Sequence, residues 1–230
     1  MKSRLLFLMC FISFQFSQAQ QDKQLTHYVF DKMSFNPATT GSKGYCGTFI
    51  YRNQWDRVQD APNTTLLNVQ GNFPRRNFGA GLSFTNDAIG FQRSNILTLN
   101  AAYHLPTNAG VLSAGVGLGL INVGFSPVWI PPQNENDPIL PQATAGTTLD
   151  LNLGFYWHGT TAPYYVGFST THLAPSTLDQ INFSVARHYY ILAGYNFSLN
   201  SVRKIDIKPN ILIKADGATT IFDINVLGDF

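Results

Sequence analysis

Charged side chains are scarce in this sequence. Its 230 residues include 15 Lys and Arg and 13 Asp and Glu, so that charged residues make up 12% of the chain, where a soluble domain has about 25%. The formal net charge of +2 is too small to indicate nucleic-acid binding. After the N-terminus, no run approaches the ~18 consecutive apolar residues of a transmembrane helix, which excludes a bundle of such helices.

Cysteine is almost absent as well, with Cys10 and Cys46 as its two occurrences. Cys10 lies in a predicted signal peptide over residues 1–19. This segment has a short basic start, a mostly apolar stretch over residues 5–16, and the small residue Ala19 before the expected cleavage. Cleavage would leave one cysteine, which excludes an intramolecular disulfide in the mature chain.

Two-residue alternation of apolar and polar residues is abundant. It is clearest over residues 112–120, where Leu, Ala and Val alternate with Ser and Gly. Because successive side chains of a strand point to opposite faces, this pattern predicts a strand with one aliphatic face and one nearly bare face. Similar segments lie at residues 45–53, 64–73, 78–85, 97–103, 149–158, 163–172, 189–199, 205–214 and 222–227. Their length, about ten residues, suits a tilted crossing of a bilayer.

A soluble β-sandwich would alternate in the same way and is the alternative fold. Two features favour a membrane barrel: aromatic residues gather at strand ends, as in interfacial belts, and the polar faces are rich in Gly, Ser and Asn. A sheet in lipid is expected to close, since hydrocarbon cannot satisfy edge N–H and C=O groups. We therefore predict an all-β fold, an antiparallel transmembrane outer-membrane β-barrel of about ten strands over residues 45–230. An aromatic-rich periplasmic segment over residues 20–44 would precede it.

The longest stretch without alternation covers residues 127–146. It is rich in proline and polar residues, which predicts a loop. This loop either plugs the barrel or binds a partner. Its oxygen-rich run at residues 134–137 lacks the spacing of a calcium-binding loop and is interpreted as a solvated turn.

Sequence signatures of catalysis are missing. There is no G-x-S-x-G, phosphate-binding loop, H-E-x-x-H or C-x-x-C motif. The five histidines have no metal-ligand spacing; they are His27, His104, His158, His172 and His188. We expect no catalytic residue, cofactor or metal, although a hydrolase site assembled from separate strands stays a remote alternative.

Charged residues on the polar faces of the last two predicted strands are candidate contacts. Lys208, Lys214 and Asp223 lie at such positions. They would either pair across the lumen as a polar lining or contact a plug or partner.

Several short sequence blocks follow one another along nearly the whole mature chain. They are QLTHYVF at residues 24–30, NPA at 36–38, YRNQW at 51–55, ND at 86–87, YVGFS at 165–169 and KP at 208–209. Together these blocks resemble the PorP/SprF family of type IX secretion system membrane proteins.

The resemblance implies a function in the envelope of Bacteroidota. Members of that family are outer-membrane β-barrels associated with the secretion machinery, and some are needed to export or display gliding adhesins. The resemblance therefore implies a non-enzymatic component, which docks partner proteins and thereby supports export or surface display of secreted proteins. Its expected partners are other type IX secretion components, adhesin-type substrates and outer-membrane lipid. The alternative function is an outer-membrane channel for small solutes.

Two further expectations follow from this resemblance. Arg52, Gln54 and Trp55 in the YRNQW block are candidates for a partner or lumen contact. In the competing interpretation they form a structural strand-end cluster, with Trp55 at the membrane interface and Arg52 paired to a lumenal carboxylate. Since family members usually run longer, the chain is expected to be a short variant or to be truncated at Phe230.

Overall fold

The computed structural model describes residues 28–55, 57–126, 143–160, 162–174, 177–178, 183–200 and 205–229. The predicted signal peptide, residues 127–142 of the predicted loop and Phe230 lie outside the described residues. Within the described part of the chain, no helix is long and apolar enough to cross a membrane.

The fold is all-β. Its strands are β1 (Cys46–Asn53), β2 (Asn63–Phe73), β3 (Phe78–Ile89), β4 (Gln92–Pro106), β5 (Gly110–Phe125), β6 (Thr144–Gly159), β7 (Tyr164–Thr171), β8 (Thr177–Leu178), β9 (Phe183–Ser184), β10 (His188–Tyr195), β11 (Phe197–Asn200), β12 (Ile205–Ala215) and β13 (Thr220–Asp229). Two short 3₁₀ helices, η1 (Pro37–Thr39) and η2 (Pro74–Arg76), complete the described elements.

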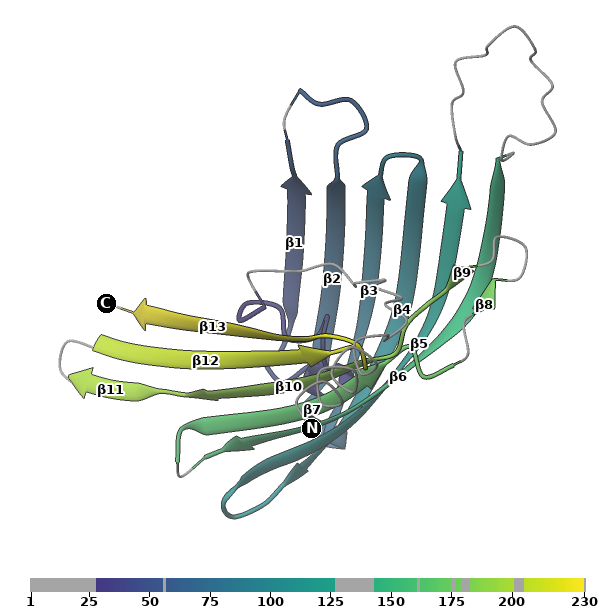
Figure 1. Ribbon diagram of the computed structural model, residues 1–230. Coiled ribbons are helices and arrows are strands. Elements are labelled where there is room, and N and C mark those ends of the chain that lie inside the picture. Colours follow the sequence, from purple (N-terminus) through teal and green to yellow (C-terminus); the bar gives the residue numbers. More distant parts are fainter. Residues whose placement is uncertain are drawn as a thin grey trace, which may run out of the picture.

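Eleven of the described strands form one antiparallel sheet, in which β1 to β7 pair in chain order and β10 follows β7. Both β10 and β11 pair with β12, and β13 pairs with the other edge of β12. The short strands β8 and β9 form a separate pair. The predicted antiparallel all-β architecture is confirmed, and Figure 1 shows how strongly the sheet twists and curls from β1 to β13.

Proline explains the gap between β10 and β11. Gly194 pairs with Asn210 and Phe197 pairs with Ile207, so both strands follow one line along β12. Pro209 lies opposite the gap and has no N–H to donate to that ladder. On its other side, Pro209 stays in register with Val226 of β13.

The two rims of the sheet differ in their connections. The short-turn rim, as we call it, carries the connections at residues 74–77, 107–109 and 160–163. The opposite long-loop rim carries the three longest connections, at residues 54–62, 126–143 and 172–187, together with two tight turns. In outer-membrane barrels, short turns face the periplasm and longer loops face outward.

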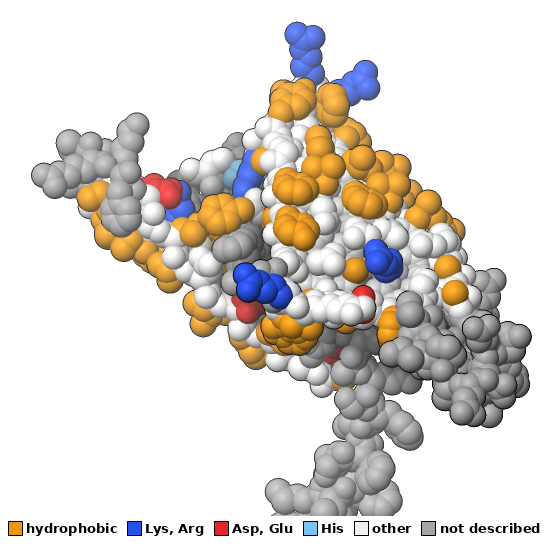
Figure 2. Space-filling view, turned by 90° about the horizontal axis from the view of Figure 1, so that it is seen from above, with side chains coloured by type: hydrophobic (Ala, Val, Ile, Leu, Met, Phe, Trp, Pro, Cys, Tyr) orange, Lys and Arg blue, Asp and Glu red, His pale blue; other side chains and the backbone are white. Residues whose placement is uncertain are grey.

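The outer face of the sheet is apolar and exposed. Large hydrophobic side chains alternate along the strands with buried inner residues, and mid-strand examples are Leu99, 63% exposed, and Leu118, 61% exposed. In the view of Figure 2, hydrophobic side chains gather over a broad part of the surface, with few charged ones among them. This is the alternation that the sequence predicts, and it suits contact with lipid.

The sheet is open between β1 and β13, which are its two edges. The closing pair expected for a barrel is not found among the described strands. One buried cluster nevertheless unites Leu66 of β2, Leu192 of β10 and Leu212 of β12 with Tyr28 and Phe35, which precede β1. The first and last strands thus curl around one shared interior core.

Candidate functional site

Residues 28–45, which we call the interior segment, begin against the inner face of the sheet over residues 28–41 and end at the exposed Tyr45. Most of its side chains from Tyr28 to Gly41 are buried, although η1 is its only described regular element. Buried polar groups need hydrogen-bond partners. The inner face of the sheet supplies them at four places.

Asn36 holds the centre of the segment. Its side-chain Nδ2 donates to the backbone oxygens of Phe155 in β6, at 2.9 Å, and of Phe168 in β7, at 3.3 Å. Its Oδ1 accepts from the backbone N–H of Ala38 at 2.9 Å, which caps η1. One fully buried side chain therefore joins the segment to two strands and also orders its own turn.

Glycines form the floor beneath this turn. A Cβ on Gly154 of β6 would lie 2.1 Å from Asn36 Oδ1, and one on Gly115 of β5 would lie 2.3 Å from the backbone nitrogen of Ala38. Gly115 and Gly154 are cross-strand partners. The bare inner face of these strands is thus the surface on which the turn packs, because a side chain at Gly115 would collide with the backbone of the turn and one at Gly154 would collide with the side chain of Asn36.

A polar cluster holds the start of the segment. Asn68 of β2 donates through Nδ2 to Asp31 Oδ2 at 2.5 Å and to Ser34 Oγ at 2.8 Å. The Ser34 hydroxyl donates to the same Asp31 oxygen at 2.5 Å. Asp31 is 1% exposed, and these two donors replace the water that its Oδ2 would otherwise bind, whereas its Oδ1 is buried without a hydrogen-bond partner among the described residues.

The end of the segment is held by β2, β4 and β5. The Nε2 of His104 lies 3.0 Å from the backbone oxygen of Thr40, which can only accept, so His104 donates there. A neutral His104 then accepts at Nδ1 from the hydroxyl of Ser113, at 2.7 Å. The backbone N–H of Gly41 donates to Oε1 of Gln70 at 2.7 Å.

Aromatic and hydroxyl contacts reach the last strands. The Tyr28 hydroxyl donates to the backbone oxygen of Asp223 in β13 at 3.3 Å, and the ring of Phe35 meets the ring of Tyr190 edge-on at 5.5 Å. The Ser169 hydroxyl of β7 donates to the Phe35 carbonyl at 2.6 Å. Burial, with the nearby Asp223 charge second, raises the pKa of Tyr28 to about 12, so its hydroxyl keeps its proton.

Lys32 brings a cation into this interior. Its Nζ lies 3.2 Å from the ring centroid of Tyr165 and 5.7 Å from that of Tyr156, a cation–π arrangement. Burial, with the charge of Lys43 second, lowers the pKa of Lys32 to about 7. The interior therefore holds an amine that changes charge near neutral pH.

Two small cavities lie between the segment and the sheet among the described residues. Their volumes are about 60 and 40 Å³, each large enough for a few water molecules at most. Both are lined by polar side chains, namely Ser34, Ser83, Thr98, Asn152 and Thr171.

The structure separates the three residues predicted in the YRNQW block. Trp55, 71% exposed, continues the exposed row of Phe49 and Tyr51, whereas Arg52 and Gln54 alternate with that row on the inner side. Gln54 donates its backbone N–H to the Pro62 oxygen at 3.0 Å and so closes the loop at the long-loop rim. Arg52 and Gln54 are therefore half-buried, whereas Trp55, which follows the end of β1 with a left-handed φ of +55°, is exposed.

Nor do the three predicted charges of the last strands form one site. Lys208 lies towards the short-turn rim and pairs with Asp229 of β13. Lys214 is six positions along β12, roughly 20 Å away along an extended strand, and its Nζ lies 6.0 Å from the Tyr190 ring. Asp223 is paired in register with Leu212, next to Lys214 on the inner face, and its backbone oxygen accepts from Tyr28.

An acid–base pair lies beside the larger of these two cavities. His172 Nδ1 lies 3.1 Å from Asp150 Oδ1, and Asn152 donates to the other oxygen of Asp150 at 3.1 Å. Asn152 also accepts the backbone N–H of His172, which has a left-handed φ of +58°. These contacts fix the imidazole in place. Within the described ranges, no three His, Cys, Asp or Glu side chains are grouped to hold a metal ion.

The family profile described as "Type IX secretion system membrane protein PorP/SprF" matches residues 17–230. The chain belongs to the PorP/SprF family. This PorP/SprF protein is therefore a membrane component of the type IX secretion system. Its family is not known for enzymatic activity. Comparison with curated proteins and with solved structures found no match.

The residues that hold the interior segment of this PorP/SprF protein escape prediction from sequence. His104, Asn68 and Gln70 are ordinary polar residues at inward strand positions. The sequence signal that could have indicated this packing was the combination of a glycine-rich strand face with the NPA block at residues 36–38. Neither feature alone indicates which segment packs on which face, because their contacts join residues far apart in the sequence.

Proposed function

We propose that this PorP/SprF protein is a non-enzymatic outer-membrane component that supports export or surface display of secreted proteins by docking partners. Other type IX secretion components and adhesin-type substrates are its proposed partners. Family membership supports the secretion role. One observation favours the binding of partners over transport or catalysis: the chain's own residues 28–41 occupy the interior of the sheet.

A solute channel is the competing function. The two polar cavities described beside the interior segment, of about 60 and 40 Å³, are each large enough for a few water molecules. A channel through this interior would require the segment to leave, and with it the hydrogen bonds of Asn36, Asp31 and Gly41. Docking on the rims and edges requires no such change.

Candidate docking residues lie on the long-loop rim. The loop after β1 is ordered by the backbone bond from Val58 to Trp55, at 3.0 Å, and by Gly90 donating to Asp60, also at 3.0 Å. Val58 is 57% exposed beside Trp55. We propose that Trp55 lies at the membrane interface and that Arg52 and Gln54 contact a partner or the interior. Lys208, Lys214 and Asp223 are proposed as structural contacts of the last strands.

Affinity purification from the native envelope in mild detergent tests the docking function. The tagged full chain should recover other type IX secretion components, identified by mass spectrometry. A second tagged outer-membrane barrel of the same envelope serves as control. The proposal fails if the two baits recover the same proteins.

Export and permeability separate docking from transport. In a deletion strain, docking predicts loss of specific secreted proteins from the surface, with uptake of small solutes unchanged. Complementation with Arg52→Ala or Gln54→Ala should restore export only in part, whereas Arg93→Gln, on the outer face, should restore it fully. Reduced solute uptake with normal export would favour the channel.

A further inference from the structure

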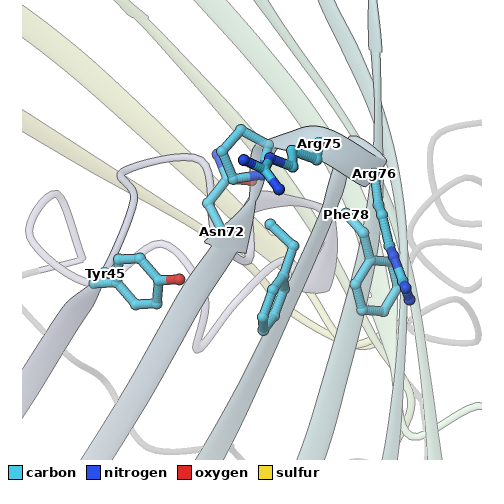
Figure 3. Close-up of a pocket in the computed structure, with 7 residues that line it drawn as sticks. Tyr45, Asn72, Arg75, Arg76 and Phe78 are labelled. Atoms are coloured by element: carbon cyan, nitrogen blue, oxygen red, sulfur yellow. The ribbon is translucent and has the colours of Figure 1, made fainter.

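A hollow on the outer face lies at the short-turn rim, outside the interior segment's contacts with the sheet. Its volume is about 690 Å³, and it is lined by Tyr45, Asn72, Phe73, Pro74, Arg75, Arg76 and Phe78. Figure 3 shows Tyr45 reaching towards it from the β1 side and the side chain of Arg76 extending beside the ring of Phe78.

The apolar wall of this hollow belongs to the outer, lipid-facing surface. Phe73 ends β2 and Phe78 begins β3, with ring centroids 6.4 Å apart. Tyr45, 80% exposed, covers Gly71, whose missing Cβ would lie 3.0 Å from that ring. Away from the short-turn rim, the exposed side chains on the outer face of β2 continue with Val69. Aromatic residues at strand ends mark the level of the headgroups.

The upper edge of the hollow is cationic. Arg75 and Arg76 form the 3₁₀ turn η2 together with Pro74, and Asn77 ends the turn with a left-handed φ of +50°. Both arginines are exposed, and no acidic side chain is among the described residues that line the hollow. Guanidinium groups bind phosphate oxygens through paired, charge-assisted hydrogen bonds.

We propose that this hollow binds an anionic glycerophospholipid from the membrane leaflet at the short-turn rim. The phosphate would accept hydrogen bonds from Arg75 and Arg76, and an acyl chain would lie along Phe73, Phe78 and the apolar row below them. An acidic protein segment could also satisfy the arginines. The lipid is favoured because the apolar wall continues into the surface that faces hydrocarbon.

The double variant Arg75→Gln with Arg76→Gln tests this site. Purified protein is exchanged into detergent with phosphatidylglycerol, and bound lipid is counted by native mass spectrometry. The variant should hold phosphatidylglycerol roughly tenfold more weakly than the wild type, because it loses charge-assisted hydrogen bonds. Arg93→Gln is the matched control, since Arg93 is exposed on the outer face of β4 at the opposite rim, and it should bind as the wild type does.

A second variant guards against misfolding of the first. Tyr45→Ala removes one wall and leaves the turn intact, and it should also weaken phosphatidylglycerol binding. Equal lipid retention in the double variant and in the Arg93→Gln control would overturn the proposal. So would displacement of the lipid by excess inorganic phosphate, which would indicate a bare phosphate site. The proposal would likewise be overturned if the double variant retained lipid as the wild type does but lost an acidic protein that copurifies with the wild type.

Discussion

Glycine decides at single positions whether the interior segment can pack. A Cβ on Gly115 would lie within 2.5 Å of backbone atoms of Pro37 and Ala38, and backbone atoms cannot rotate away. On Gly124, farther along the same strand, the nearest neighbour would be the Cβ of Ala145 at 3.6 Å, an ordinary contact. One strand thus offers both a tight glycine and an open one.

We predict that Gly115→Ala displaces the interior segment. Overpacking of this kind costs about 1–3 kcal/mol, and the hydrogen bonds of Asn36 would be lost with it. Hydrogen exchange over residues 28–45 should therefore accelerate. Gly124→Ala is the control and should leave exchange unchanged. Equal protection in both variants would contradict the packing described here.

Lys32 makes the packing of the interior segment on the sheet depend on pH. Its pKa falls from 10.5 to about 7 on burial, so between these values the displaced segment binds a proton that the docked segment lacks. The equilibrium constant for packing of the interior segment should thus increase as pH rises from 7 to 9, by up to roughly tenfold per pH unit. Below about pH 7 both states carry the charge and the dependence vanishes.

Exchange rates over residues 28–45, corrected for their intrinsic pH dependence, measure this effect. Lys32→Met cannot titrate and should show a flat profile over the same range. A wild-type profile as flat as that of Lys32→Met would show that the amine keeps its charge in the interior.

At the scale of elements, the turn between β12 and β13 depends on one carboxylate. Asp216 Oδ1 accepts the backbone N–H groups of Thr219, at 2.7 Å, and of Ala218, at 3.0 Å. These bonds, the Thr219 bond first, lower the pKa of Asp216 below its ordinary value of 3.8. The stabilisation is present above that ordinary value and is lost as pH falls through the lowered one.

We predict that Asp216→Ala speeds hydrogen exchange of the Ala218 and Thr219 amides several-fold at pH 6. Asp216→Asn keeps an acceptor oxygen and should retain most of the protection, but without the loss of protection at acidic pH. If all three proteins exchanged alike, the side chain would have no part in ordering the turn.

The strands are the part of the fold that the sequence predicts well. Residues 112–120 alternate so regularly that both the strand and its exposed face follow from the two-residue period. The interior segment is different, because irregular backbone has no period and its partners lie on strands far along the chain. The sequence predicts that one face of β5 is nearly bare, and only the fold reveals that residues 36–38 cover it.

The predicted site residues show the same limit. Trp55 and Arg52 are neighbours in one sequence block, yet Arg52 is a half-buried residue of β1, whereas Trp55 follows the end of that strand with a left-handed φ of +55° and is exposed. Lys208 and Lys214 share a face but lie near opposite ends of β12. Closeness in sequence therefore overstated closeness in space, whereas Asp223, which is distant in sequence, does contact Tyr28.

At the scale of the whole molecule, the outer face should tolerate charge only near its rims. Leu99→Arg, in the middle of β4, is predicted to lower the free energy of unfolding in a bilayer by about 2–4 kcal/mol. Leu105→Arg, at the end of the same strand, should cost about 0–1 kcal/mol. Denaturant titration in lipid vesicles measures both, and equal costs would contradict a lipid-facing surface.

The hydrogen bond from Tyr28 to Asp223 joins residues 195 positions apart, and those from Asn36 to β6 and β7 span 119 and 132. During synthesis the leading part of the chain thus emerges long before the last of the strands that receive it. Its contacts with β2 and β4 can form early, but the bond from Tyr28 to β13 has to wait until the final hairpin has formed. Protection of the backbone around Tyr28 is for that reason a readout of completed assembly.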